Sequence, residues 1–298
     1  MDLVEAVVLG VVQGLTEWIP ISSTAHLRIV PALAGWPDPG AAFTAVIQLG
    51  TLAAVLVYFW KDLKNIAVSW GRSLVAGPIA KTPESQMGWA ILAGTVPVVV
   101  LGLIFSKQIK TELRSLNVIA YALILMGIVM WIADRYSGGR KRLKDVKPAS
   151  GWVVGLWQAL ALIPGVSRSG STISGARFLG FDRPIAARFS FLLSIPSVLG
   201  AGLLELWQER KEIVGPQLAP TLVATVVSFG VGYLSIKYFM QYLQRHSLIF
   251  FVLYRIALGV LILVLLSKGT LKPLDHSKPQ SVVPERSHVI LSTQASRA

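Results

Sequence analysis

Long apolar runs, each close to the length that crosses a membrane, dominate the pattern of hydrophobic and polar residues along this chain. A helix needs about 20 apolar residues to span the hydrocarbon core of a bilayer. Six runs approach or reach this length and predict transmembrane helices. They cover residues 42–60, 87–105, 117–133, 186–207, 221–239 and 249–267.

Two further apolar segments are interrupted at their centres by proline and hydroxyl residues. The first covers residues 3–33 and is broken at 20–23, and the second covers 151–179 and is broken at 164–172. Neither half of either segment is long enough to cross a bilayer. Broken helices are tolerated at membrane depth where they are buried in protein or line a wet cavity. Both segments are therefore predicted to form re-entrant helical hairpins.

The two interrupted segments resemble each other, which indicates an internal duplication. Each has a glutamine on an apolar helix, Gln13 or Gln158, followed by Ile-Pro and a hydroxyl-rich turn. One hairpin and three spans in each half, an odd number of crossings, would place the second half upside down relative to the first, as in transporters built from inverted repeats. The predicted fold is an all-α polytopic membrane protein of two inverted repeats, at about residues 1–140 and 150–268 of one membrane domain (1–268). The two hairpin tips would then meet in one cavity near the midplane.

Composition supports the membrane class. The chain has 298 residues, of which 53% are hydrophobic and 14% charged, and its mean hydropathy of +0.62 excludes a soluble globular domain. The absence of cysteine excludes disulfides, thiolate metal ligands and a cysteine nucleophile. The net charge of +13 comes from Lys and Arg in loops and tail, where orientation signals and lipid head groups explain it, so no nucleic-acid partner is predicted. The polar, proline-containing tail (269–298) is expected to be disordered.

Basic residues also predict an orientation. They are denser in the connections at residues 61–81 and 135–147, interpreted as loops, than in the connections expected on the opposite side. The positive-inside rule places these two connections in the cytoplasm and both chain termini outside. With this orientation the cavity is expected to open outward.

The break at residues 164–172 reads P-G-V-S-R-S-G-S-T and combines a cation with hydroxyl groups inside an apolar region. The planar guanidinium of Arg168 suits phosphate oxygens, and the helix expected to begin near Thr172 would aim free N–H groups at the same spot. Glycines allow the chain to turn tightly here. The segment therefore predicts a phosphate-binding site, to which Ser167, Ser169, Gly170 and Thr172 contribute beside Arg168.

The break in the first hairpin carries the groups that could perform chemistry. Glu17 is the clear carboxylate inside an apolar run, where an ionisable group is costly and a functional role is the default. Gln13 lies four residues earlier on the same helix face, so the pair could bind a divalent cation or activate water, the alternative being a helix–helix hydrogen bond. His26 is the one histidine of the membrane part. It follows Ser22 and Ser23 and could act as a general acid or base, or hold the nucleophile in place.

Other polar or aromatic residues have two interpretations. Arg255, in the middle of the last span, could supply a second positive charge to a substrate, or it could be a structural partner of Glu17 or of carbonyls at helix ends. The tryptophans, Trp18 among them, fall mostly near the ends of predicted helices, and an aromatic belt explains them.

The two signatures of the undecaprenyl-pyrophosphate phosphatase family, the bacitracin-resistance proteins of bacterial cell membranes, are similar to two segments of this chain. These are Q-G-L-T-E-W-I-P-I-S-S-T-A-H at residues 13–26 and P-G-V-S-R-S-G-S-T at residues 164–172. The resemblance covers residues 1 to about 267 and leaves the tail outside. The family's first signature has Glu or Gln, then three residues, then Glu, and the resemblance places Gln13 at the first of these positions and Glu17 at the second. It likewise places the family's hydroxyl and histidine on Ser23 and His26, and its phosphate-binding arginine on Arg168.

The resemblance implies hydrolysis of undecaprenyl diphosphate to undecaprenyl phosphate and inorganic phosphate, which recycles the lipid carrier of peptidoglycan synthesis and confers bacitracin resistance. We expect Ser23 to be the nucleophile, with Glu17 or His26 taking its proton; direct attack by water held on Glu17 stays open. Arg168 and the helix N-termini would neutralise the diphosphate. The resemblance also places the protein in the bacterial inner membrane, with the cavity expected to open to the outer face. The expected partners are the lipid substrate and membrane lipid, and a homodimer is left open.

A divalent cation, Mg²⁺ or Ca²⁺, would bridge Glu17 and the diphosphate. Glutamine at position 13 removes one charge from a two-carboxylate metal site, so this expectation rests on Glu17.

Two alternatives remain at this stage. A transporter or flippase of a lipid phosphate would use the same inverted-repeat cavity, without a bond-cleaving nucleophile. The type 2 phosphatidic-acid phosphatases share serine, histidine and arginine signatures, but no histidine and aspartate follow Arg168 at the required spacing.

Overall fold

The computed structural model describes residues 1–76, 82–110, 113, 115–208 and 217–271. Within these ranges the chain is helical, and one isolated bridge between Lys141 and Phe181 is its only extended pairing. Five helices are long and apolar enough to cross a membrane, and a bent pair of helices adds a sixth candidate. The expected all-α polytopic class is therefore confirmed. The tail from residue 272, and the basic residues Lys81, Arg114, Arg210 and Lys211, lie outside the described residues.

The described helices fall into two sets, one in each half of the chain. The first half contains α1 (Leu3–Trp18), α2 (Ser23–Ala34), α3 (Gly40–Tyr58), α4 (Trp60–Ala76), α5 (Pro83–Ile104), α6 (Ser106–Lys110) and α7 (Leu116–Tyr136). The second half contains η3 (Leu143–Asp145), α8 (Pro148–Leu160), α9 (Arg168–Phe178), α10 (Arg183–Gln208), α12 (Leu218–Leu243) and α13 (Ile249–Ser267).

Both interrupted segments form a pair of helices, α1–α2 and α8–α9, and a serine caps the second helix of each; the re-entrant placement of these hairpins in a membrane stays a prediction. Ser22 and Ser167 have φ angles of 74° and 72° and are the two non-glycine residues with positive φ in the described chain. Their hydroxyls accept hydrogen bonds from the N–H groups of Ala25 and Gly170, three residues further on. Such N-caps satisfy a donor that the first helical turn leaves free. Because Ser167 caps α9, this helix begins at Arg168, four residues before the start near Thr172 that the sequence had suggested.

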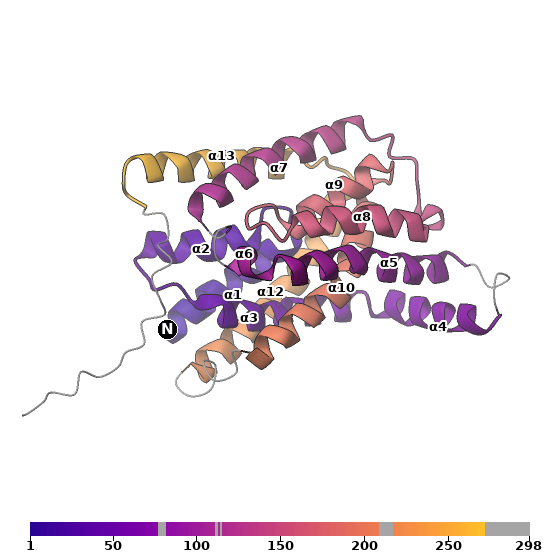
Figure 1. Ribbon diagram of the computed structural model, residues 1–298, viewed down its shortest axis with the longest axis horizontal. Coiled ribbons are helices and arrows are strands. Elements are labelled where there is room, and N and C mark those ends of the chain that lie inside the picture. Colours follow the sequence, from indigo (N-terminus) through magenta and orange to yellow (C-terminus); the bar gives the residue numbers. More distant parts are fainter. Residues whose placement is uncertain (77–81, 111–112, 114, 209–216, 272–298) are drawn as a thin grey trace, which may run out of the picture.

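The two halves pack against each other reciprocally. Helix α1 lies along α12 and α8 lies along α5, while α3 contacts α10 and α7 lies beside α13 (Figure 1). Glycines allow the close approaches: a Cβ atom on Gly10 would lie 2.6 Å from the carbonyl oxygen of Ala224, and one on Gly155 would lie 2.3 Å from that of Gly94. Small residues at such crossings are typical of helices packed in membranes. The reciprocal pairing supports the duplication, and the inversion of the second half across a membrane stays a prediction.

The connection at residues 61–81, interpreted from the sequence as a loop, is largely the helix α4. This helix bends by 76° from α3 and packs on α5, where Gly88 makes room for Trp70. The ring of Trp70 also contacts Trp89, with centroids 5.8 Å apart. The sequence misled because α4 is amphipathic, so its apolar positions recur on one face without forming a continuous run.

A buried ionic cluster fixes the far end of α9. Asp134 of α7 accepts hydrogen bonds from Arg183 Nε and Nη2, at 2.7 and 3.1 Å, and from the backbone N–H of Leu248, at 3.1 Å. Arg177, at the end of α9, places its Nε 3.2 Å from the same carboxylate. The cluster therefore joins α7, α9, α10 and the start of α13. It fixes the C-terminal end of α9, whose N-terminal end follows the break of the second hairpin.

Candidate active site

A polar cavity of about 190 Å³ lies where the two hairpins meet. The sequence predicted that the hairpin tips would converge on one cavity, and the wall contains residues from both. Its polar wall residues are Glu17 of α1, Ser22, Ser23 and Thr24 at the start of α2, Gln48 of α3, Gln158 of α8, Ser167 and Arg168 at the start of α9, and Ser197 of α10.

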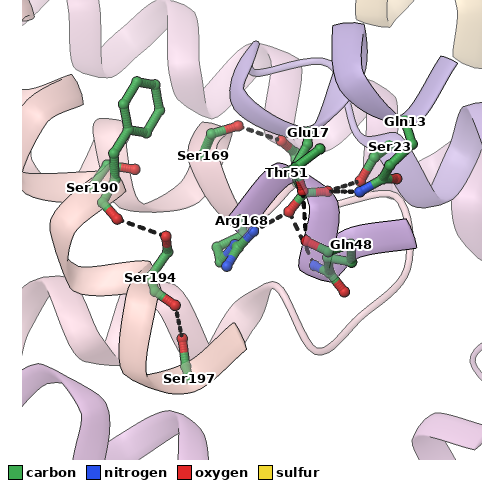
Figure 2. A network of polar contacts seen from close by, with 12 residues as sticks. Gln13, Glu17, Ser23, Gln48, Thr51, Arg168, Ser169, Ser190, Ser194 and Ser197 are labelled. Atoms are coloured by element: carbon green, nitrogen blue, oxygen red, sulfur yellow. Dashed lines mark hydrogen bonds and ion pairs between the residues drawn. The ribbon is translucent and has the colours of Figure 1, made fainter. Parts of the chain in front are cut away.

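Glu17 is the centre of the polar contacts in this cavity. Its Oε2 accepts hydrogen bonds from Gln13 Nε2, at 2.9 Å, and from Ser23 Oγ, at 2.7 Å (Figure 2). Its Oε1 accepts a hydrogen bond from Gln48 Nε2, at 3.0 Å, and forms an ion pair with Arg168. Four side chains therefore fix both oxygens of a carboxylate that is only 6% exposed. Gln13 and Glu17 do share a helix face, and the amide serves to orient the carboxylate.

One buried nitrogen of Arg168 lacks a hydrogen-bond partner in the described chain. Its Nη2 pairs with Glu17, and its guanidinium carbon lies 5.5 Å from the centre of the Trp18 ring. Its Nη1 is buried and has no hydrogen-bond partner among the described residues. An arginine held by a carboxylate and an aromatic face keeps its remaining donors in fixed directions. The observed geometry therefore suits an anion in the cavity.

The first turns of α2 and α9 add to this positive character. Both helices begin at the cavity wall, with Ser22 and Ser167 as their N-caps. The N-terminus of a helix carries a partial positive charge and presents free N–H groups, which favours bound phosphate. Together with Arg168, the two helix starts make the cavity suited to a diphosphate.

His26 forms hydrogen bonds with Ser22 and Tyr254, and in the described part of the chain no hydrogen bond joins it to Ser23. Its Nδ1 is 2.8 Å from the Ser22 carbonyl oxygen, which can only accept, so this nitrogen donates the hydrogen bond. Its Nε2 is 2.7 Å from the Tyr254 hydroxyl, and the two rings are stacked with centroids 5.7 Å apart. Of the two roles that the sequence allowed, this geometry favours holding the turn before the nucleophile over taking its proton.

Arg255 is completely buried and forms hydrogen bonds with backbone carbonyl groups. It donates hydrogen bonds to the carbonyl oxygens of Pro20, at 3.1 Å, Gly165, at 2.9 Å, and Val166, at 2.8 Å, and it lies near that of Leu123. These carbonyls belong to the breaks of both hairpins, so Arg255 joins the hairpin tips. It does not line the polar cavity. The structure thus shows the helix-end role that the sequence left open beside substrate binding.

Three residues of the predicted phosphate-binding segment form its support. Ser169 donates a hydrogen bond to the Ile19 carbonyl oxygen at 3.2 Å, and Thr172 shares one with Ser190 at 2.6 Å. A Cβ atom on Gly170 would lie 2.7 Å from Arg255 Nη1, so glycine is required for this approach. Ser169, Gly170 and Thr172 lie behind the wall, while Ser167 and Arg168 line the cavity.

Sequence reasoning missed five residues of this site, one of which, Thr24 at the start of α2, lies on the cavity wall. Trp18, interpreted as part of an aromatic belt, is 1% exposed and packs beside Arg168. Gln48, Gln158 and Ser197 line the polar cavity and received no role. All three are polar residues in apolar helices. A polar side chain in an apolar run indicates a functional role, and this argument, made above for Glu17, applies to these three residues as well.

The cavity offers one carboxylate to a metal ion. Among the described residues, no three His, Cys, Asp or Glu side chains come together as a metal site. Glu17 is the acidic residue of the cavity wall. Magnesium is often held by one or two carboxylates together with substrate phosphates and water. Because Gln13, Ser23, Gln48 and Arg168 already contact the Glu17 carboxylate, an ion would have to displace one of these donors.

An apolar groove of about 520 Å³ adjoins the polar cavity. Leu162 and Ile163, between α8 and α9, line both. The other lining residues are Leu101 and Phe105 at the end of α5, Gln108, Ile109 and Leu113 beyond it, and Leu156, Trp157, Ala159 and Leu160 of α8. A polar head and an apolar tail of one ligand could therefore be bound side by side.

Comparisons with known proteins agree with this arrangement. Residues 6–261 match the family described as bacitracin resistance protein BacA. The undecaprenyl-diphosphatase of Thermobifida fusca is 49% identical over 276 residues, covering 92% of this chain and 93% of that protein. That of Chloroherpeton thalassium is 51% identical over 283 residues, covering 91% and 99%. Undecaprenyl-diphosphatase 2 of Streptomyces coelicolor is 48% identical over 285 residues, covering 92% and 98%.

Proposed function

Because the chain belongs to the family of the bacitracin resistance protein BacA, we propose that its polar cavity hydrolyses undecaprenyl diphosphate to undecaprenyl phosphate and inorganic phosphate. The protein is a multi-pass membrane phosphatase that recycles the lipid carrier of peptidoglycan synthesis, and this activity confers bacitracin resistance. One observation in the site carries the proposal: the Ser23 hydroxyl donates a hydrogen bond to Glu17 at 2.7 Å, beside an arginine with a free buried nitrogen. A nucleophile, a base and a phosphate-binding cation thus lie together.

The proposed reaction uses these three groups in turn. Glu17 takes the proton of Ser23 as its Oγ attacks the terminal phosphorus, and the bond from that phosphorus to the bridging oxygen breaks to release undecaprenyl phosphate. Glu17 passes this proton to the departing phosphate oxygen and becomes a carboxylate again. Water then attacks the phosphoserine and gives a proton to Glu17, which transfers it to the Ser23 oxygen as the bond from phosphorus to that oxygen breaks. Arg168 and the helix N-termini stabilise the charge that develops on the phosphoryl oxygens. Direct attack by water held on Glu17 is the alternative mechanism.

The apolar groove indicates where the prenyl chain of the substrate would bind. A prenyl chain is purely hydrocarbon, and the groove between α5 and α8 adjoins the polar cavity, since Leu162 and Ile163 line both. Burying the first isoprene units there would place the diphosphate between α8 and Glu17. The rest of the chain would pass sideways between helices into the bilayer.

A divalent cation, Mg²⁺ or Ca²⁺, is proposed as a cofactor. Glu17 would hold it together with oxygens of the diphosphate, in competition with Arg168 for the carboxylate. When bound, such an ion supplies additional positive charge to the phosphoryl group.

Purified protein in detergent is expected to release phosphate from undecaprenyl diphosphate, and EDTA is expected to abolish this release until Mg²⁺ or Ca²⁺ is added back. The transporter alternative receives no support from the relatives, whose names are those of phosphatases. Detergent removes the two compartments that transport needs, so release there measures hydrolysis alone. Lipid movement in vesicles without any phosphate release would contradict the proposed function. Full activity in EDTA would contradict the proposed requirement for a divalent cation.

We further propose two inverted repeats in the bacterial inner membrane, with both chain ends and the cavity mouth toward the outer face. The chain has no cysteine, so single cysteines can report the orientation. Pro37→Cys, between α2 and α3, is expected to react with a membrane-impermeant maleimide in intact cells. Arg140→Cys, after α7, is expected to react only after the membrane is opened. The reverse labelling pattern would refute this orientation.

A further inference from the structure

Gln158 carries a buried donor that the protein itself does not use. The side chain is 1% exposed and lines the polar cavity. Its Oε1 lies 3.3 Å from the Ser197 hydroxyl, which is also 2.9 Å from the Ser194 carbonyl oxygen, while its Nε2 has no partner among the described residues. A buried amide that lacks a hydrogen-bond partner is unfavourable, and such groups in cavities commonly meet a ligand.

The duplication explains why this donor is free. Gln13 and Gln158 correspond in the two halves, because each lies nine residues before the serine that caps the second helix of its hairpin, Ser22 or Ser167. Gln13 donates to Glu17, four residues further along the helix. The residue four positions after Gln158 is Leu162, which has no acceptor. The first glutamine therefore orients the base, and the amide of the second stays available to a ligand.

The position of Gln158 indicates which part of the ligand it contacts. It lies on α8, whose residues Leu156, Trp157, Ala159 and Leu160 line the apolar groove. Leu162, one turn further on, lines both the groove and the polar cavity. Gln158 is thus beside the junction of the two spaces, whereas Ser23 and Glu17 contact each other on α1 and α2.

We infer that Gln158 is a substrate-binding residue that donates a hydrogen bond to the α-phosphate, the one that stays on the prenyl chain. This inference rests on the proposed function, because it presupposes a diphosphate substrate whose two phosphates bind in different parts of the cavity. Arg168 and the start of α2 bind the terminal phosphate that is transferred, and Gln158 holds the leaving group. Ser197 lies beside Oε1 of the amide, on the side away from the unpartnered Nε2.

The inhibition constants of the two products can distinguish binding at the two phosphate positions. Undecaprenyl phosphate keeps the α-phosphate and the chain, while inorganic phosphate corresponds to the transferred group. In Gln158→Leu, the inhibition constant of undecaprenyl phosphate and the KM for the diphosphate are expected to rise about tenfold, as for loss of one hydrogen bond to a charged group. The inhibition constant of inorganic phosphate is expected to stay within about twofold of wild type. Ser197→Ala should shift the same constants in the same direction, by less.

Gln48→Leu is the matched comparison, because that glutamine donates to Glu17. It is expected to lower kcat without the selective change in undecaprenyl phosphate inhibition. An unchanged constant for undecaprenyl phosphate in Gln158→Leu, or an equal rise for both inhibitors, overturns the inference. If the leucine variant loses its thermal unfolding transition, the isosteric Gln158→Glu decides: its carboxylate should weaken undecaprenyl phosphate binding more than tenfold if the amide contacts the α-phosphate. Failure of the proposed function would be seen separately, as absence of phosphate release by wild type.

Discussion

Replacing Arg168 by alanine is expected to leave a folded protein that has lost nearly all phosphatase activity. Arg168 is the charged donor of the polar cavity, and its Nη1 has no partner in the described chain. Arginines that stabilise a transferring phosphoryl group contribute roughly a thousandfold or more to turnover, and a loss of that size is expected here. The measurement is phosphate release from undecaprenyl diphosphate in detergent, beside a thermal unfolding curve.

Arg168→Lys is the control for this prediction. Lysine restores the charge, but it has no planar fork to bridge Glu17 and a phosphate at once. Activity between the alanine variant and wild type is therefore expected. Folding should survive in both variants, because Glu17 keeps the hydrogen bonds from Gln13, Ser23 and Gln48. Near wild-type turnover in Arg168→Ala would remove the arginine from the mechanism.

The sequence predicted the class of the fold and the main groups of the site, because both depend on local patterns. Apolar runs give the spans, and a proline among hydroxyls in an apolar run gives a broken helix. Glu17 and Arg168 stand out because charged groups at such depth need a partner, and here each is the partner of the other. These inferences need only the composition of a segment and its expected depth.

Contacts between distant segments could not be predicted in this way. The position of Arg255 in the last apolar run predicts that it lies deep in the membrane, but it does not predict that carbonyls from both hairpin breaks surround the guanidinium. Trp18 was assigned to an aromatic belt because it is near a helix end, whereas the packing of α9 covers it with Arg168. The start of α9 was placed late because the capping role of Ser167 depends on a positive φ angle, which is rare for serine.

Glu17→Gln is expected to lower turnover by roughly a hundredfold to ten-thousandfold, because amide nitrogen and oxygen cannot take the Ser23 proton as a carboxylate does. Ser23→Ala should cause a similar loss if Ser23 is the nucleophile. Groups that act as one unit give non-additive losses, so the double variant is expected to be no slower than the more damaged single one. Thr16→Val is the control for removal of a hydroxyl near Glu17, since Thr16 donates to the Val12 carbonyl oxygen; its turnover should stay near wild type.

The two mechanisms that the cavity allows differ in the fate of the terminal phosphate. If Ser23 attacks, rapid acid quenching after mixing with substrate labelled in that phosphate should leave label on the protein, and Ser23→Ala should abolish it. Hydrolysis of the phosphoserine requires a base as well, so Glu17→Gln, in which some attack persists, would show slow formation of the same labelled species. Turnover close to wild type in Ser23→Ala, together with a severe loss in Glu17→Gln, would instead assign the attack to water held by Glu17. In that case the 2.7 Å contact between Ser23 and Glu17 would serve to position the base.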